Sequence, residues 1–404
     1  MSILSRRAAV LVFLAFAFAY FFSAMIRANT ATLSPTLTQE FALNARDLGL
    51  LAGGYFLGFA AMQLPLGNLL DRHGPKKVIL SFLSLAVLGC VAFSWATSFG
   101  GLLVARVLCG VGVSACLMAP LTGYRRWFVS ATQLRANSWM LMSGSLGMVA
   151  STLPVQWLLP VLGWRPLFWG LAAMVLLSML VIAVQVPGWR AQPIGATGEK
   201  GSYADVWRHP YFRKMAPLGF FNYGGLLSIQ TLWAVPWMIR VTGYTPVQAA
   251  TGLFWINVAM LMTFWTWGLL NPWLVRRGMS AERLIARGLP ASLIVLAIII
   301  GAGANLSAQS GVLLALFCMT STFVSLAQPA VGMAFPAELA GRALSAYNLV
   351  IFSGVFTVQW GIGLLIDGLR ALGWTETEAF QGALGVFLAC CIASYVYFLV
   401  AKKS

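Results

Sequence analysis

Twelve long apolar runs constrain what this chain can fold into more than any other feature of its sequence. A helix that crosses a bilayer needs about 20 mostly apolar residues, and runs of this length recur along all 404 residues. They lie at about 9–33, 48–70, 78–97, 100–123, 136–158, 165–186, 215–239, 249–270, 285–304, 311–335, 343–366 and 380–400. The predicted fold class is therefore an all-α polytopic membrane protein with 12 transmembrane helices.

Composition excludes the other broad classes of protein. Apolar residues make up 60% of the chain and charged residues only 9%, whereas roughly a quarter of an average soluble domain is charged. A soluble enzyme, a disordered chain or a disulfide scaffold could not keep so much apolar surface from water. The apolar runs are also continuous, unlike the alternating strands of about 10 residues that form an outer-membrane barrel.

The basic residues indicate which side of the membrane each loop faces, because cytoplasmic loops carry an excess of Lys and Arg. With a cytoplasmic N-terminus, 20 of the 26 Lys and Arg fall in cytoplasmic segments. The other six are Arg27, Arg46, Arg106, Arg165, Arg240 and Arg370. We therefore predict a multi-pass protein of the bacterial inner membrane with both termini cytoplasmic. The net charge of +16 then reflects topology and contact with the lipid bilayer, with no nucleic-acid partner.

The first run, 9–33, is interpreted as a retained helix, since it exceeds the apolar core of about 7–15 residues in a signal peptide. The longest stretch without a run divides the chain into six runs on each side. The predicted domains are an N-terminal six-helix bundle at 1–186, a cytoplasmic linker at 187–214 and a C-terminal six-helix bundle at 215–404. Four matched pairs in chain order favour an internal duplication: Gly67 with Gly268, Gly74 with Gly278, Arg135 with Arg342, and Leu162 with Leu372.

The loop at 67–77 carries a glycine-rich, charged signature. Its aspartate ends one helix beside a basic cluster, which suits a conformational latch formed by Gly67, Asp71, Arg72 and Gly74. The loop closely resembles the G-x-x-x-D-R-x-G-R-[KR] signature of the major facilitator superfamily, with Pro75 in place of the arginine after the second glycine. Arg106, Gly110, Gly112 and Pro120 resemble the pattern of that family's fourth span. The resemblance covers the whole chain and implies two six-helix bundles with a solute site between them, alternately open to each side.

Arg27 is the first of two charges expected inside the membrane, where charged residues are rare and usually functional. It lies on a polar stripe of the first run whose spacing places its members on one helix face: Tyr20, Ser23, Arg27, Thr30 and Ser34. One interpretation is an anion-binding guanidinium in a cavity. The alternative is a side chain that extends to the periplasmic headgroups.

A narrower resemblance favours the first interpretation. The first run is similar to that of the organophosphate/phosphate antiporters and organic-anion symporters, in which a tyrosine and an arginine seven residues later face the substrate; Tyr20 and Arg27 match them. Gln63 replaces the lysine of the antiporters, and Gln230 lies near the position of their second arginine. Val113 replaces the glutamate of the symporters. With a single cavity arginine, the resemblance implies a monoanion such as a carboxylate with an apolar body.

Several neutral polar residues of the later runs are candidates for the opposite wall of the site. They are Tyr223, Gln230 and Trp233 in the seventh run, Asn257 in the eighth, and Asn348 and Gln359 in the eleventh. Each is alternatively a partner in a hydrogen bond between helices. Arg106 is the second intramembrane charge, with either a structural role or a role in coupling.

The acidic residues bear on how transport is coupled, because a proton-coupled carrier usually needs a buried group that titrates near neutral pH. None of the ten acidic residues lies in the middle of a run, and both histidines are expected to be cytoplasmic. Asp367, at the outer end of the eleventh run, is the carboxylate that could still carry a proton. The six cysteines lack metal-type spacing, so we expect no metal and no cofactor.

Function is predicted as secondary transport of a small organic anion by a monomer, and not as catalysis. One alternative is an exporter of neutral or amphiphilic compounds. It is disfavoured because no acidic residue lies mid-run and because the Gly-Pro pair typical of antiporters is absent from 143–147. A non-transporting sensor on the same fold is the other alternative, disfavoured because no appended domain is evident.

Overall fold

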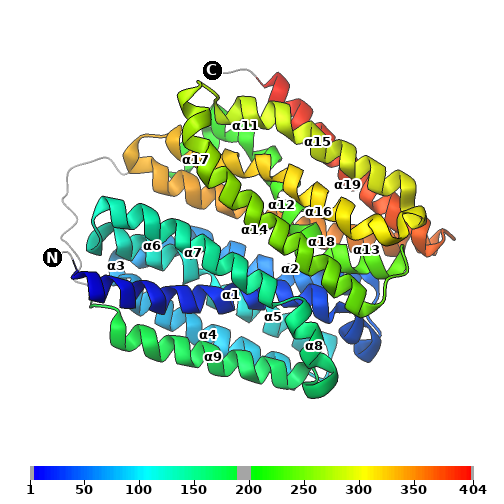
Figure 1. The fold of residues 1–404 in the computed structure, drawn as a ribbon, viewed down its shortest axis with the longest axis horizontal. Coiled ribbons are helices and arrows are strands. Elements are labelled where there is room, and N and C mark those ends of the chain that lie inside the picture. The colour runs from blue at the N-terminus through cyan, green and yellow to red at the C-terminus, as the bar shows by residue number, and fades with distance from the viewer. Residues whose placement is uncertain (1–3, 189–201, 402–404) are drawn as a thin grey trace. The chain divides into compact units, whose positions relative to one another are not determined.

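The computed structural model describes residues 4–188 and 202–401, and within these ranges the secondary structure is helical, without strands. The predicted linker at 187–214 lies partly outside them, at 189–201. The first half contains α1 (Arg6–Phe41), α2 (Ala45–Ala61), α3 (Gln63–His73), α4 (Pro75–Trp95), α5 (Phe99–Val113), α6 (Ala115–Trp127), α7 (Ser130–Ala150), α8 (Leu153–Leu162) and α9 (Trp164–Gln185) (Figure 1).

The second half is more often interrupted. It contains α10 (Tyr203–Arg208), α11 (Pro210–Leu218), η1 (Gly219–Tyr223), α12 (Gly224–Ser228), η2 (Ile229–Trp233), α13 (Ala234–Arg240), α14 (Pro246–Arg276), α15 (Ala281–Ala302), η3 (Gly303–Gln309), α16 (Ser310–Ser321), η4 (Thr322–Leu326), α17 (Ala327–Met333), α18 (Ala337–Ala371) and α19 (Glu376–Val400). The segments η1 and η2 are π-helical, whereas η3 and η4 are 3₁₀-helical.

Most of these helical residues belong to segments that are candidate membrane spans. Among the described residues, eight helices are long and apolar enough to cross a bilayer, and ten if each of two bent pairs forms one span. The stretch Ala281–Met333, at 53 residues, holds two of the predicted runs, and the interrupted stretch from α11 to α13 holds another. Each of the 12 predicted runs thus falls on helix, and the all-α polytopic fold is confirmed.

Proline explains the two bends. α2 and α3 meet at 45°, and Pro65 lies in the first turn of α3. Proline lacks the N–H that would continue the helical hydrogen bonds and its ring clashes with the preceding turn. α7 and α8 meet at 44°, again with a proline, Pro154, at the start of the second helix.

Helix packing divides the described residues into two compact units. The first unit comprises residues up to Asn29 together with Leu57–Glu199, and the second comprises Thr30–Phe56 together with Lys200 onward. The second unit therefore contains the end of α1 and most of α2. The domain boundaries predicted at 187–214 stay a prediction.

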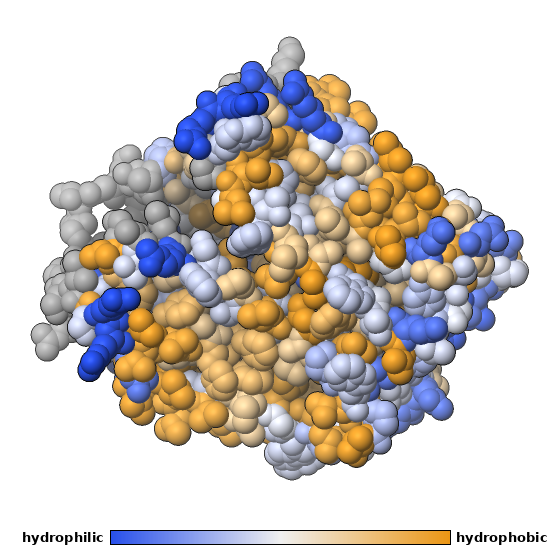
Figure 2. Space-filling model, in the orientation of Figure 1, coloured by the Kyte–Doolittle hydropathy of each residue, from blue (hydrophilic) through white to orange (hydrophobic). Residues whose placement is uncertain are grey.

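Apolar side chains are exposed on both units. Val161 and Val184 of the first unit are 80% and 70% exposed, and Val312 of the second is 70% exposed. Figure 2 shows such residues in broad orange areas, with the hydrophilic residues gathered in separate blue patches. Contiguous apolar surface of this extent indicates contact with lipid rather than water.

Candidate functional site

Arg27 lies on α1 with a guanidinium that is only partly satisfied. Its Nη2 atom is 3.7 Å from the sulfur of Met148 on α7, and its Nε atom is buried without a hydrogen-bond partner. A thioether is only a weak hydrogen-bond acceptor. Among the described residues, no oxygen atom accepts a hydrogen bond from the Arg27 guanidinium. A half-buried guanidinium with free donors is suited to a carboxylate, which it can bind through two parallel hydrogen bonds.

Two glycines of α7 set the position of α1 in this unit. A Cβ atom on Gly147 would overlap the carbonyl oxygen of Phe21, and one on Gly144 would overlap the ring of Tyr20. The helices approach closely because both positions lack a side chain. The sequence analysis did not identify Gly144, Gly147 and Met148 as neighbours of Arg27. Gly147 and Met148 follow Gly144 by three and four residues, a spacing that places all three on one face of a helix.

The rest of the predicted polar stripe is packed against protein. Tyr20 and Ser23 are buried in the first unit, and Thr30 and Ser34 are buried in the second. The Ser34 hydroxyl donates to the carbonyl of Ala31. Of the five predicted stripe residues, Arg27 alone is more than slightly exposed.

Arg106 on α5 is fully buried and ties its helix to α1. Its Nη1 atom donates to the carbonyl oxygen of Ile26 at 2.9 Å and lies 3.5 Å from Oδ1 of Asn29. Both acceptors flank Arg27 in the sequence. Arg106 therefore holds the turn of α1 that presents Arg27.

Gln63 lies at the bend between α2 and α3. Its amide nitrogen donates to the carbonyl of Phe59 at 3.1 Å. The bend frees carbonyl groups from helical hydrogen bonds, and this side chain satisfies one of them. The contact supports a structural role for Gln63.

In the second unit, four of the predicted wall residues make hydrogen bonds with protein. Gln230 Nε2 donates to Asn257 Oδ1 at 2.8 Å, and Trp233 Nε1 donates to the carbonyl of Gln359 at 3.1 Å. The Gln359 amide donates to the hydroxyl of Thr231 at 3.0 Å, while its Oε1 atom is buried without a partner. The seventh, eighth and eleventh spans are thus linked through polar side chains.

Asn348 is a fifth wall residue that makes a hydrogen bond with protein, to a residue outside this group. Asn348 Oδ1 accepts from Gln328, a residue that sequence reasoning did not select. Tyr223 is half-buried at the end of η1. Its span holds two π-helical turns, a feature that is rare and frequently found at functional sites.

The predicted latch loop shows one clear geometric requirement for glycine. Gly74 has φ of 78° between α3 and α4, a conformation that disfavours other residues. Asp71 and Arg72 are exposed. A Cβ atom on Gly67 would meet nothing within 4 Å among the described residues. The latch function of the loop stays a prediction.

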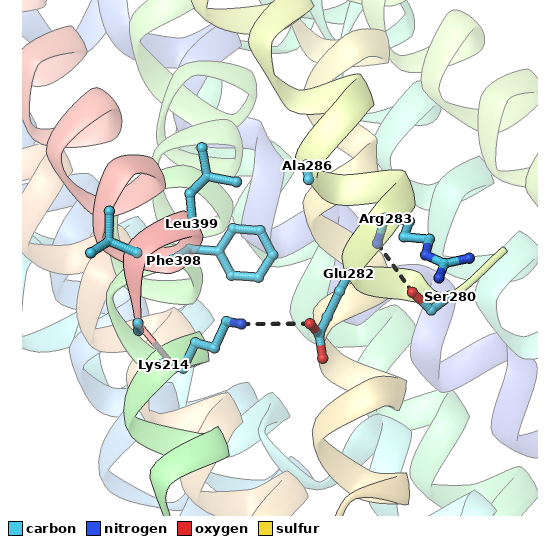
Figure 3. Close-up of a pocket in the computed structure, with 9 residues that line it drawn as sticks. Lys214, Ser280, Glu282, Arg283, Ala286, Phe398 and Leu399 are labelled. Atoms are coloured by element: carbon cyan, nitrogen blue, oxygen red, sulfur yellow. Dashed lines mark hydrogen bonds and ion pairs between the residues drawn. The ribbon is translucent and has the colours of Figure 1, made fainter. Parts of the chain in front are cut away.

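A cavity of about 380 Å³ lies in the second unit, and none of the predicted site residues lines it (Figure 3). The buried amine of Lys214 lies 3.5 Å from Glu282 and 5.1 Å from the ring centroid of Phe398. Lys214 is the last residue of the predicted cytoplasmic linker and Phe398 lies close to the predicted cytoplasmic C-terminus, so we place this charged cavity at the predicted cytoplasmic end. The Lys214 cation is already paired with Glu282. The described residues contain no group of His, Cys, Asp and Glu that could hold a metal ion.

The fold and these contacts define a class, a polytopic helical membrane protein with a polar, arginine-bearing interior. The sequence model of the Major Facilitator Superfamily matches residues 16–359. The chain therefore belongs to this superfamily of transporters. A solved D-xylose–proton symporter is similar in fold, with a TM-score of 0.79 over 98% of each chain and 14% identity.

Two curated relatives have names that specify a substrate. A probable sulfoacetate transporter of Cupriavidus necator is 26% identical over 57% of this chain and 57% of its own length. A 4-hydroxybenzoate transporter of Acinetobacter baylyi is 24% identical over 59% of this chain and 61% of its own length. The chain thus spans about three-fifths of each of these relatives. Both are named for organic anions.

Proposed function

We propose that this protein is a secondary transporter that moves a small organic monoanion, a carboxylate with an apolar body, across the bacterial inner membrane by alternating access. The observation that carries the proposal is the Arg27 guanidinium, half-buried, with a free Nε atom and only a thioether beside it. A charge held in this way lacks the oxygen partner that buried arginines normally have. A carboxylate of the substrate supplies that partner.

The relatives support an anionic substrate over a neutral one. Sulfoacetate and 4-hydroxybenzoate share a carboxylate and differ in the rest of the molecule. A single arginine that binds the shared group, with selectivity set elsewhere, accounts for such a range.

The test is the affinity of Arg27 variants for organic acids. A charge-assisted hydrogen bond in a poorly hydrated site contributes about 1.5–3 kcal/mol, or roughly 10- to 150-fold in affinity. We expect Arg27→Gln to lose this affinity, and Arg27→Lys to lose a clear part of it, because an ammonium cannot form the paired, planar contact. The readout is the ligand-induced rise in melting temperature across a panel of organic acids.

The matched control is Arg46→Gln, which removes an exposed arginine from the start of α2. It should leave the affinity unchanged. If Arg27→Gln folds and binds the anion as the parent does, Arg27 is a headgroup anchor and the organic-anion proposal loses its support. Binding of neutral amphiphiles that is insensitive to Arg27 would instead favour an exporter.

A further inference from the structure

The first turn of α2 is capped from two directions. Asn44 and Asp47 form a local capping box, in which the Asp47 amide donates to Asn44 Oδ1 at 2.8 Å and Asp47 Oδ2 accepts from the Asn44 amide at 3.5 Å. The first N–H groups of any helix lack partners within the helix. This capping box provides no hydrogen-bond acceptor for the amides of Ala45 and Arg46.

Asp367, near the end of α18, supplies the two missing acceptors. Its Oδ1 atom accepts from the Ala45 amide at 3.2 Å and its Oδ2 atom from the Arg46 amide at 2.7 Å. The carboxylate also faces the positive end of the α2 dipole. Among the described residues its partners are these two backbone amides, more than 300 positions away in the chain.

A seam of close contacts runs inward from this carboxylate. A Cβ atom on Gly363 would overlap the Ala45 carbonyl, and one on Gly49 would overlap the Gln359 carbonyl. Further along, a Cβ on Gly53 would lie 3.0 Å from the ring of Phe356. α2 and α18 therefore pack in opposite directions with backbone against backbone, and the seam ends where the rings of Phe56 and Phe352 stack at 6.2 Å.

We propose that Asp367 is the closing residue of a gate formed by α2 and α18 at the predicted periplasmic end, and that this gate parts and reseals in each transport cycle. The inference rests on the proposed function, because only a transporter needs such a gate. The helices come from the first and second halves of the sequence, which alternating access must move apart on one side at a time.

The chemistry of the contact suits reversible closure. Asp367 is half-buried and Arg46 is exposed, so water can solvate the carboxylate and the two amides when they separate. Neither side is then left with an unsatisfied buried group, whose desolvation would make opening costly. Both carboxylate oxygens of Asp367 accept an amide hydrogen bond from the start of α2 in this closed state, which suits a latch between α2 and α18.

The experiment measures the distance between nitroxide labels at Arg46 and Leu372 in the full chain, without substrate. Both positions are exposed. The parent carries Cys390→Ser, because the other five cysteines are buried. Loss of a cap lowers the stability of the capped arrangement by about 5- to 30-fold, so Asp367→Ala should shift the ratio of short to long distances by that factor. Asp367→Asn should shift it less, since its amide oxygen still accepts one bond.

The matched control is Asp47→Ala, which removes a carboxylate from the same helix end but none of the bonds to α18. It should change the ratio by less than about twofold. Gly363→Val provides a second variant, because its side chain forces the seam apart at the backbone. An unchanged ratio in Asp367→Ala, or an equal shift in Asp47→Ala, overturns the proposal. Since no substrate is present, either result is independent of whether the protein carries an organic anion.

Discussion

At the scale of single residues, the contacts distinguish side chains that bind oxygen atoms of other helices from Arg27, which lies beside a sulfur atom. The Nη1 atom of Arg106 donates to the carbonyl of Ile26 and lies 3.5 Å from the side-chain oxygen of Asn29. Gln230 and Asn257 bind each other. Arg27 has only the Met148 sulfur beside it. Two arginines on neighbouring helices thus have different roles because one finds backbone oxygen and the other does not.

The pairing of Gln230 with Asn257 predicts a coupled effect on stability. Gln230→Leu leaves the Asn257 oxygen without its donor, which should destabilise the fold by about 1–3 kcal/mol. Adding Asn257→Leu should recover part of that loss, because the unsatisfied oxygen is removed as well. Thermal unfolding of both single variants and the double variant measures this coupling. Loss of anion affinity at full stability in the single variants would instead make these residues ligand contacts.

The sequence predicts which residues are polar inside the membrane, but not which of them meet. Hydropathy and spacing identify Arg27, Gln230 and Gln359, because a polar side chain in an apolar run stands out. Their partners Met148 and Thr231 are ordinary residues of other helices, and only tertiary packing selects them. The same holds for Asp367: its position at a helix end was visible, whereas the amides it caps lie in another part of the chain.

At the scale of helices, glycine and proline decide where spans approach and where they bend. The sequence predicts the spans themselves, since each needs only a run of apolar residues. It does not predict the interruptions of the seventh span, where Gly219–Tyr223 and Ile229–Trp233 are π-helical. These turns depend on how the span packs against its neighbours, which no local pattern records.

The contact between α1 and α7 gives a prediction at this scale. Gly147→Ala places a methyl group against the Phe21 carbonyl, and overpacking of this kind costs about 1–3 kcal/mol. We expect a lower melting temperature and weaker anion binding, because the shift of α1 displaces Arg27. Gly170→Ala on α9 is the matched control, since its Cβ meets nothing within 4 Å. Equal melting temperatures for the two variants would show that this glycine does not set the helix contact.

At the scale of the whole molecule, span ends of the second unit that are predicted to face the same side of the membrane lie near one another. Lys214 precedes the seventh span, Glu282 precedes the ninth and Phe398 lies at the end of the twelfth, and the three meet around one cavity (Figure 3). Arg240 and Arg370 lie 3.4 Å and 3.9 Å from Glu376, in segments predicted to face the other side. Alternate loops therefore gather together, as they must if each span crosses the membrane once.

The orientation of that arrangement is the last prediction. Loops with many Lys and Arg are retained in the cytoplasm, and 20 of the 26 basic residues fall on the side of the termini. Reporter fusions at Ala191 and Ser404 should therefore behave as cytoplasmic, and a fusion at Gly243, in the short loop after the seventh span, as periplasmic. The three are informative together, because an inverted protein would reverse all of them. A periplasmic signal at Ala191 alone would mean that the first half contains an odd number of crossings, which contradicts the division into six and six. A periplasmic signal at both Ala191 and Ser404 would place the Asp367 gate on the cytoplasmic side.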